Sequence, residues 1–153
     1  TFKWVRPPEE KPKNILSAQM NLAYCLSVAA YDKDVKLAQF SDEKIKDPKL
    51  LAFMDRIKIS SDPELSDLNK QDSVCLPGRV TLKTKDGRAF KLQLNYAKDS
   101  TGNKATRAEL RGKFLDLSGP IIGVGKARDV SEMVYNLEKL DDISKLVQSC
   151  QAP

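Results

Sequence analysis

A change in the spacing of apolar residues limits the folds open to this chain more than any other feature of its sequence. Apolar residues fall at every second position in 80–82 and again, beyond the Asp86-Gly87 pair, in 90–96. Alternation on both sides of Asp-Gly predicts a β-hairpin with one buried face and a turn whose two central residues have positive φ. The flanking segments repeat at helical spacing. The sequence therefore predicts an α+β fold: helices, followed by an antiparallel β-sheet with a hairpin, then C-terminal helices.

The helical pattern before the hairpin predicts two helices. The first spans about residues 17–31, with Ser17 as its N-cap. Apolar residues lie on both of its sides, so we expect burial on two faces, although Tyr24 sits in its middle. Ser41 offers another cap, and Asp47-Pro48 predicts the start of the second helix, because proline suits the first helical position. The polar residues 60–73 predict a loop.

The helical pattern after the hairpin begins with a polar loop, residues 95–104, that is long enough for a lid or binding loop. Thr106 and Glu109 then form a capping box that starts a helix. The glycine-rich residues 119–127 fail the phosphate-loop pattern at two positions, so they predict a helix stop and linker. Residues 130–140 and 141–149 predict two further helices.

Length and composition favour one compact domain of residues 17–150, preceded by an extended, proline-rich arm of residues 1–16 in which Phe2 and Trp4 dock. Hydrophobic residues make up 41% of the chain, and no apolar run approaches the roughly 18 residues that cross a bilayer, so we expect no membrane contact. The net charge of +5 permits an anionic partner. The basic clusters lack interleaved aromatic residues, which argues against nucleic acid.

Histidine is absent, which removes the commonest general base and the commonest transition-metal ligand. Cys25, Cys75 and Cys150 are widely spaced and lie among apolar residues, which favours reduced, buried thiols over a disulfide or zinc. We therefore expect no metal and no cofactor, and any catalysis by this chain alone must proceed without histidine. Reduced thiols also predict a cytoplasmic location, or a mitochondrial one in a eukaryote.

Five sequence blocks stand in an order that carries a family resemblance. They are LAYCLSVAAYD, SDEKIKDPKLLAFMDRIKISSDPEL, GRVTLKTKDGRAFKLQL, AELRGKFLDL and NLEKLDDISKL. Together they cover about residues 17–148, and in this order they resemble the C-terminal part of the MmgE/PrpD family, which contains 2-methylcitrate dehydratase and cis-aconitate decarboxylase.

The resemblance implies a lid domain that closes over a larger helical domain of the same enzyme. Family members remove water or carbon dioxide from small di- and tricarboxylates without a metal, and their catalytic aspartate and histidines lie in the helical domain. The resemblance thus implies that this chain holds no catalytic residue, is inert alone, and has the helical domain and a carboxylate substrate as partners. Family dimers form through the helical domain, so a homodimer of this chain is left open.

The family pattern A-x-F-S-x-x-Y places a substrate-facing tyrosine on the first lid helix. Ala18 and Tyr24 match it, whereas Met20 and Asn21 replace Phe-Ser. We expect Tyr24 to be either a hydrogen-bond donor to substrate or a structural residue, because a buried hydroxyl needs a partner and a phenol with an ordinary pKa is a poor base at neutral pH.

Two basic residues, Lys98 and Lys104, lie in residues 97–105, where the family has a glycine- and proline-rich loop, and Arg107 follows in the first turn of the next predicted helix. They are candidate substrate-binding residues, and the alternative is a solvated loop. Two functions remain open: the lid of a carboxylate lyase, or a free-standing binding domain that keeps the fold without catalysis.

Overall fold

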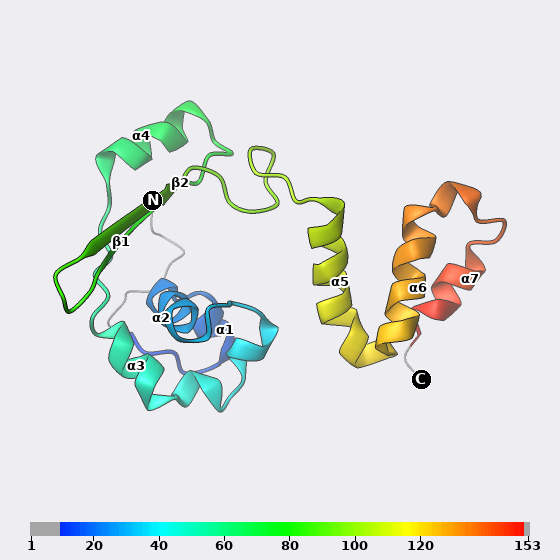
Figure 1. The fold of residues 1–153 in the computed structure, drawn as a ribbon, viewed down its shortest axis with the longest axis horizontal. Helices are drawn as coiled ribbons and strands as arrows, with labels where there is room; N and C mark the ends of the chain where they lie inside the picture. The colour runs from blue at the N-terminus through cyan, green and yellow to red at the C-terminus, as the bar shows by residue number, and fades with distance from the viewer. Residues whose placement is uncertain (1–9, 152–153) are drawn as a thin grey trace. The chain divides into compact units, whose positions relative to one another are not determined.

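A computed structural model describes residues 10–151 of the chain (Figure 1). It confirms the α+β prediction, because helices precede and follow a two-stranded antiparallel hairpin along the chain. The chain divides into two compact units, the first ending at Asp67 and the second beginning at Leu68. The predicted docking of Phe2 and Trp4 lies outside the described residues. The assignment of residues 17–150 to one domain stays a prediction.

The predicted helix over residues 17–31 is two helices, α1 (Ile15–Gln19) and α2 (Leu22–Asp32). Asn14 caps α1 in a capping box with Ser17, so the prediction of Ser17 as the N-cap is wrong by three residues. Asn21 interrupts the helix, because its side-chain oxygen accepts the backbone N–H of Tyr24 at 2.9 Å and begins α2. The amide of Asn21 also donates to the backbone oxygen of Glu10 at 2.7 Å.

The core of the first unit lies between α2 and α3 (Pro48–Met54). Its fully buried residues are Ala18, Ala23, Tyr24, Val28, Ile45, Leu50 and Met54. Only one face of α2 is buried, whereas Leu22 and Ala29 are exposed. The expectation of a helix buried on two sides is therefore wrong.

Local capping explains the other short helices of the first unit. Asp47 caps α3 with Pro48 at its first position, as predicted. The Ser41 hydroxyl accepts the N–H of Lys44, at the start of the 3-10 turn η2 (Lys44–Lys46), which follows η1 (Leu37–Phe40).

Residues 60–73 are not the predicted loop, because they contain α4 (Pro63–Gln71). The Asp62 carboxylate accepts the backbone N–H of Glu64 at 3.0 Å and caps the first turn. Asp62-Pro63 repeats the Asp-Pro start seen at α3. That signal was present in the sequence, but the polar composition hid it.

The hairpin pairs β1 (Gly78–Lys83) with β2 (Ala89–Leu94), and Val80 faces Leu92 in the register. Its turn differs from the prediction, because Gly87 has a φ of 88° and Asp86 does not have a positive φ. Gly87 donates to the oxygen of Thr84, as in a three-residue loop with a glycine bulge. The predicted apolar face exists, but its side chains are about half exposed rather than buried.

The C-terminal segment forms α5 (Arg107–Ile122), α6 (Val124–Tyr135), the 3-10 turn η3 (Leu137–Lys139) and α7 (Ser144–Ser149). The capping box of Thr106 and Glu109 is confirmed. The helix stop predicted within residues 119–127 is confirmed at Gly123, which has a φ of 87° and ends α5. The predicted linker is wrong, because α5 continues through Pro120 and Gly123 alone separates it from α6. Ile122, Ala127 and Val130 form a small core between these two helices.

The three cysteines differ in burial. Cys75 is buried and Cys25 half-buried, whereas Cys150 is exposed, so the prediction of three buried thiols is wrong for Cys150. All three are free thiols. No helix within residues 10–151 is long and apolar enough to span a bilayer.

Candidate functional site

The predicted cationic residues Lys98, Lys104 and Arg107 lie on one continuous segment of the second unit, between the end of β2 and the first turn of α5. The loop that carries them folds back on itself. The N–H of Asp99 donates to the oxygen of Asn103 at 2.9 Å, and Ser100 pairs with Asn103 in an isolated bridge. These backbone hydrogen bonds therefore hold the loop that carries Lys98 and Lys104 in a folded conformation.

Tyr96 anchors this loop. Its hydroxyl donates to the Asp72 carboxylate at 2.9 Å, and this hydrogen bond raises the pKa of the Tyr96 phenol. Its ring lies so close to Gly102 that a Cβ there would be only 2.3 Å from a ring carbon. Position 102 therefore requires glycine for close approach.

The positive charge of Lys98 is paired with a carboxylate of α5. Its ammonium forms an ion pair with Glu109 at 2.7 Å. The Lys98 hydrogen bond, together with hydrogen bonds from Thr106, lowers the pKa of Glu109 to about 2. Glu109 also closes the capping box of α5. Lys98 thus fastens the loop to the first turn of that helix.

Lys104 and Arg107 are exposed and keep their side-chain donors free. Within the described residues, neither side chain makes a hydrogen bond or an ion pair. The Arg107 guanidinium carbon lies 3.8 Å from the centre of the Tyr135 ring, and the Tyr135 hydroxyl donates to the backbone oxygen of Arg107 at 3.0 Å. Both cations can therefore bind an anion without breaking an internal contact.

Tyr24, the fourth predicted site residue, is fully buried in the first unit. Its hydroxyl donates to the backbone oxygen of Gln39 at 2.7 Å, and its ring centre lies 5.8 Å from that of Phe40. Burial, more than any neighbouring charge, raises the pKa of Tyr24 to about 12. The phenol is therefore neutral at ordinary pH and acts as a donor, and in this structure it donates to a backbone carbonyl.

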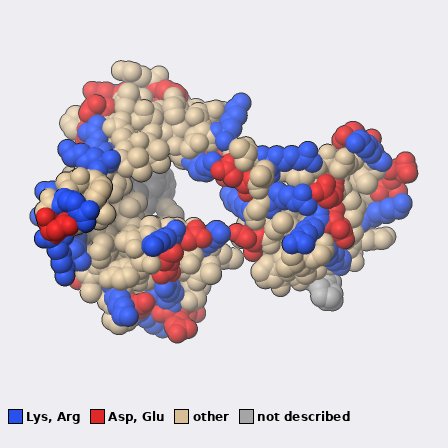
Figure 2. Space-filling model, viewed as in Figure 1, with Lys and Arg blue, Asp and Glu red and all other residues tan. Residues whose placement is uncertain are grey.

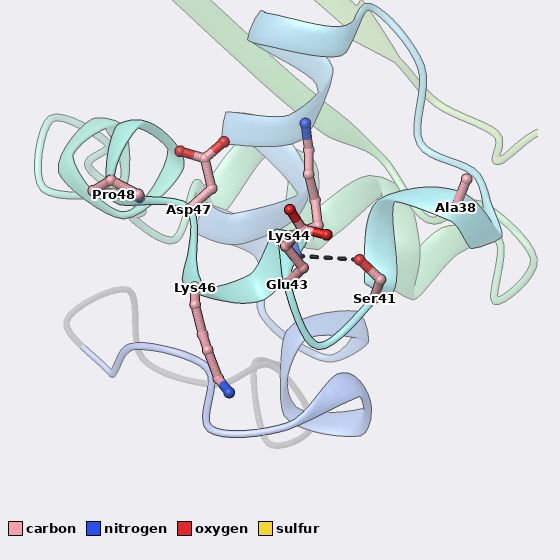
Figure 3. Close-up of a pocket in the computed structure, with 7 residues that line it drawn as sticks. All are labelled: Ala38, Ser41, Glu43, Lys44, Lys46, Asp47 and Pro48. Atoms are coloured by element: carbon pink, nitrogen blue, oxygen red, sulfur yellow. Dashed lines mark hydrogen bonds between the residues drawn. The ribbon is translucent and has the colours of Figure 1, made fainter.

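A hollow of about 580 Å³ also lies in the first unit. Ala38, Ser41, Glu43, Lys44, Lys46, Asp47 and Pro48 line it (Figure 3). Lys44 is paired with Asp32 at 3.0 Å, and Figure 3 shows the side chains of Lys44 and Lys46 pointing in opposite directions. The two lysines therefore do not converge on one anion.

Basic and acidic side chains are interspersed over the face shown in Figure 2. Among residues 10–151, no three His, Cys, Asp or Glu side chains are grouped so that they could hold a metal ion. The candidate site is the basic segment of residues 98–107, in which Lys104 and Arg107 have side-chain donors without a partner among the described residues.

Comparison with known proteins decides the family. The model of the MmgE/PrpD C-terminal domain matches residues 2–139. This chain belongs to the MmgE/PrpD family. It is 27% identical over 156 residues to cis-aconitate decarboxylase of Aspergillus terreus, and 28% identical over 155 residues to the same enzyme of the strain NIH 2624 / FGSC A1156. Each match covers 98% of the chain and 30% of the relative, so the chain spans less than a third of these proteins.

Sequence reasoning found the cations of this MmgE/PrpD domain but missed what holds them. Tyr135 lies 28 positions from Arg107, and no local spacing connects them. Asn21, which departs from the family pattern at the tyrosine motif, is the N-cap of α2, a role that Asn commonly fills. The glycine at position 102 was visible in the sequence, but its contact with Tyr96 was not.

Proposed function

We propose that this chain is the substrate-capping C-terminal domain of a metal-independent lyase that acts on small di- or tricarboxylates. The family match over residues 2–139 is the observation that carries the proposal, and the name of the Aspergillus relatives, cis-aconitate decarboxylase, supplies the substrate class. The family resemblance places the catalytic aspartate and histidines in the helical domain, so we assign proton transfer to that domain, and this chain has no histidine. The 153 residues alone are then catalytically inert.

In this proposal, Lys104 and Arg107 bind carboxylate groups of the substrate. A guanidinium presents paired donors that match a carboxylate, and Lys104 adds a second positive charge three positions earlier in the chain. Lys98 contributes less directly, because its charge is already paired with Glu109.

Tyr24 remains a candidate substrate donor in the assembled enzyme. Its hydroxyl hydrogen is donated to Gln39 here, so a contact with substrate requires it to change partner. The raised pKa favours this donor role over that of a base.

A chimera tests the proposal. The matched region of the Aspergillus terreus enzyme is replaced by this chain, and turnover of ¹³C-labelled cis-aconitate is followed by NMR, which distinguishes release of carbon dioxide from addition of water. We expect turnover by the chimera and none by the isolated chain. A folded chimera without turnover of cis-aconitate, 2-methylcitrate or citrate would contradict the proposal and favour a free-standing binding domain.

Two matched lysine variants locate the anion site within the chimera. Lys104→Met removes an unpaired ammonium, whereas Lys113→Met removes one that is paired with Asp99 at 3.5 Å. We expect Lys104→Met to raise KM roughly tenfold, since a hydrogen bond to a charged group is lost, and Lys113→Met to leave KM near its starting value. Equal effects of the two variants would remove Lys104 from the site.

A further inference from the structure

We infer that Tyr135 is a positioning residue, whose ring orients the Arg107 guanidinium so that its edge binds a substrate carboxylate. This inference rests on the proposed function and deepens it. Tyr135 lies at the end of α6 and Arg107 at the start of α5, so neighbouring helices supply the two partners. Neither the family match nor the relatives' names assign a role to Tyr135.

Two contacts join Arg107 and Tyr135: the guanidinium lies on the ring, and the ring hydroxyl bonds to the Arg107 backbone. The guanidinium carbon is 3.8 Å from the ring centre, while the Tyr135 hydroxyl donates to the Arg107 backbone oxygen at 3.0 Å. The other guanidinium-ring contacts among the described residues are longer, 5.0 Å for Arg56 over Phe53 and 5.8 Å for Arg88 over Phe90. A distance of 3.8 Å is van der Waals contact, and we take the guanidinium to stack flat on the ring, the arrangement that brings most of its atoms into contact.

A flat guanidinium has a consequence for binding. The ring covers one face of the group, but the N–H donors lie in its plane and point outward from its edge. Within the described residues no acceptor takes those donors. The side chain is thus held without using the hydrogen bonds that a carboxylate needs, and less conformational freedom is lost when the carboxylate binds.

The other arginines within residues 10–151 lack this combination. Arg88 also lies near a ring, but its Nε donates to Asp86 at 2.8 Å, so part of its edge is occupied. Arg111 is paired with Glu132 at 2.6 Å. No partner of the Arg56 donors lies among the described residues, as for Arg107, but its ring contact is 1.2 Å longer (5.0 against 3.8 Å). Arg56 is therefore the matched control.

The test is an NMR titration of the ¹⁵N-labelled full chain with citrate, observed at the arginine side chains. We expect Arg107, but not Arg56, to show ring-current-shifted resonances and to move with citrate. Tyr135→Phe keeps the ring and should bind citrate like the original chain. Tyr135→Leu should abolish the ring-current shift and weaken citrate binding about two- to fivefold, the range expected for an exposed cation–π contact.

Arg107→Lys keeps the inference falsifiable if Tyr135→Leu fails to fold. It retains the charge but not the planar fork that stacks on the ring, so we expect it to lower the citrate affinity, and an unchanged citrate affinity would overturn the inference. Unchanged citrate affinity in a folded Tyr135→Leu chain would overturn the inference, and so would citrate that perturbs Arg56 as much as Arg107.

The titration and the chimera fail independently. If the chimera turns over cis-aconitate while the Arg107 resonances do not move with citrate, the proposed function stands and this inference falls. If Arg107 binds citrate through the Tyr135 stack but the chimera is inactive, the anion site stands without the lyase function.

Discussion

The first unit of the chain and the second are stabilised to different degrees by their own packing. Seven fully buried residues, Tyr24 among them, form the core of the first unit, whereas three form the core between α5 and α6. The hairpin of the second unit keeps every strand residue exposed. Side-chain donors without a partner among the described residues occur in both units, on Arg56 in the first and on Lys104 and Arg107 in the second. The difference between the units therefore lies in their cores, and packing stabilises the first unit more than the hairpin and its basic loop.

We expect the largest loss of stability from a substitution in the core of the first unit. Leu50→Ala removes a side chain that is 1% exposed, so we expect a loss of about 2–5 kcal/mol in the free energy of unfolding. Leu92→Ala makes the same chemical change at a hairpin position that is 64% exposed, where we expect a loss within about 0.5 kcal/mol. Urea denaturation of both variants measures the difference. Equal losses would show that the hairpin is buried in solution.

A glycine pair tests the anchoring of the basic loop. Gly102→Ala pushes a methyl group into the Tyr96 ring, which Asp72 holds in place, so we expect destabilisation by about 1–3 kcal/mol. Gly112→Ala, inside α5 with open space around it, should instead stabilise by about 0.5–1 kcal/mol. Thermal melting followed by circular dichroism distinguishes them. A neutral Gly102→Ala would show that the loop is not held by Tyr96.

A smaller effect comes from the hydroxyl of Tyr24. Tyr24→Phe keeps the ring in the core but removes the donor to the Gln39 carbonyl, and we expect a loss of about 1 kcal/mol. Tyr31→Phe is the control, because Tyr31 is about half exposed and no hydrogen bond of its hydroxyl was found within the described residues. Chemical denaturation measures both. If Tyr24→Phe left the free energy of unfolding unchanged, the hydrogen bond to the Gln39 carbonyl would not stabilise the fold.

The smallest effect is the pH dependence of the α5 cap. Hydrogen bonds from Lys98 and Thr106 lower the pKa of Glu109 from 4.5 to about 2. Because the folded-state pKa is depressed, the stabilising contribution is present above about pH 4.5 and is lost as the pH falls through 2. A ¹³C NMR titration of the Glu109 carboxyl measures this. A midpoint near 4.5, or a Glu109→Gln chain with the same acid sensitivity, would contradict the cap geometry.

The sequence was sufficient where one local pattern decides the structure. The alternation in the hairpin, the Asp47-Pro48 start and the Thr106 capping box all reappear in the structure. The predictions failed where two local signals compete: Asn21 splits an apolar run into two helices, and the Asp62-Pro63 start lies inside a polar stretch. The Arg107 and Tyr135 contact could not be predicted, because it joins separate helices without any local spacing.

The central claim, that this chain completes a lyase site supplied by another domain, is tested most directly by isothermal titration. The chain is titrated into the part of the Aspergillus terreus enzyme that precedes the matched region, and cis-aconitate turnover is assayed in the same samples. We expect saturable binding, with turnover that appears only when both parts are present. No binding by two folded parts, or turnover by the 153 residues alone, would contradict it.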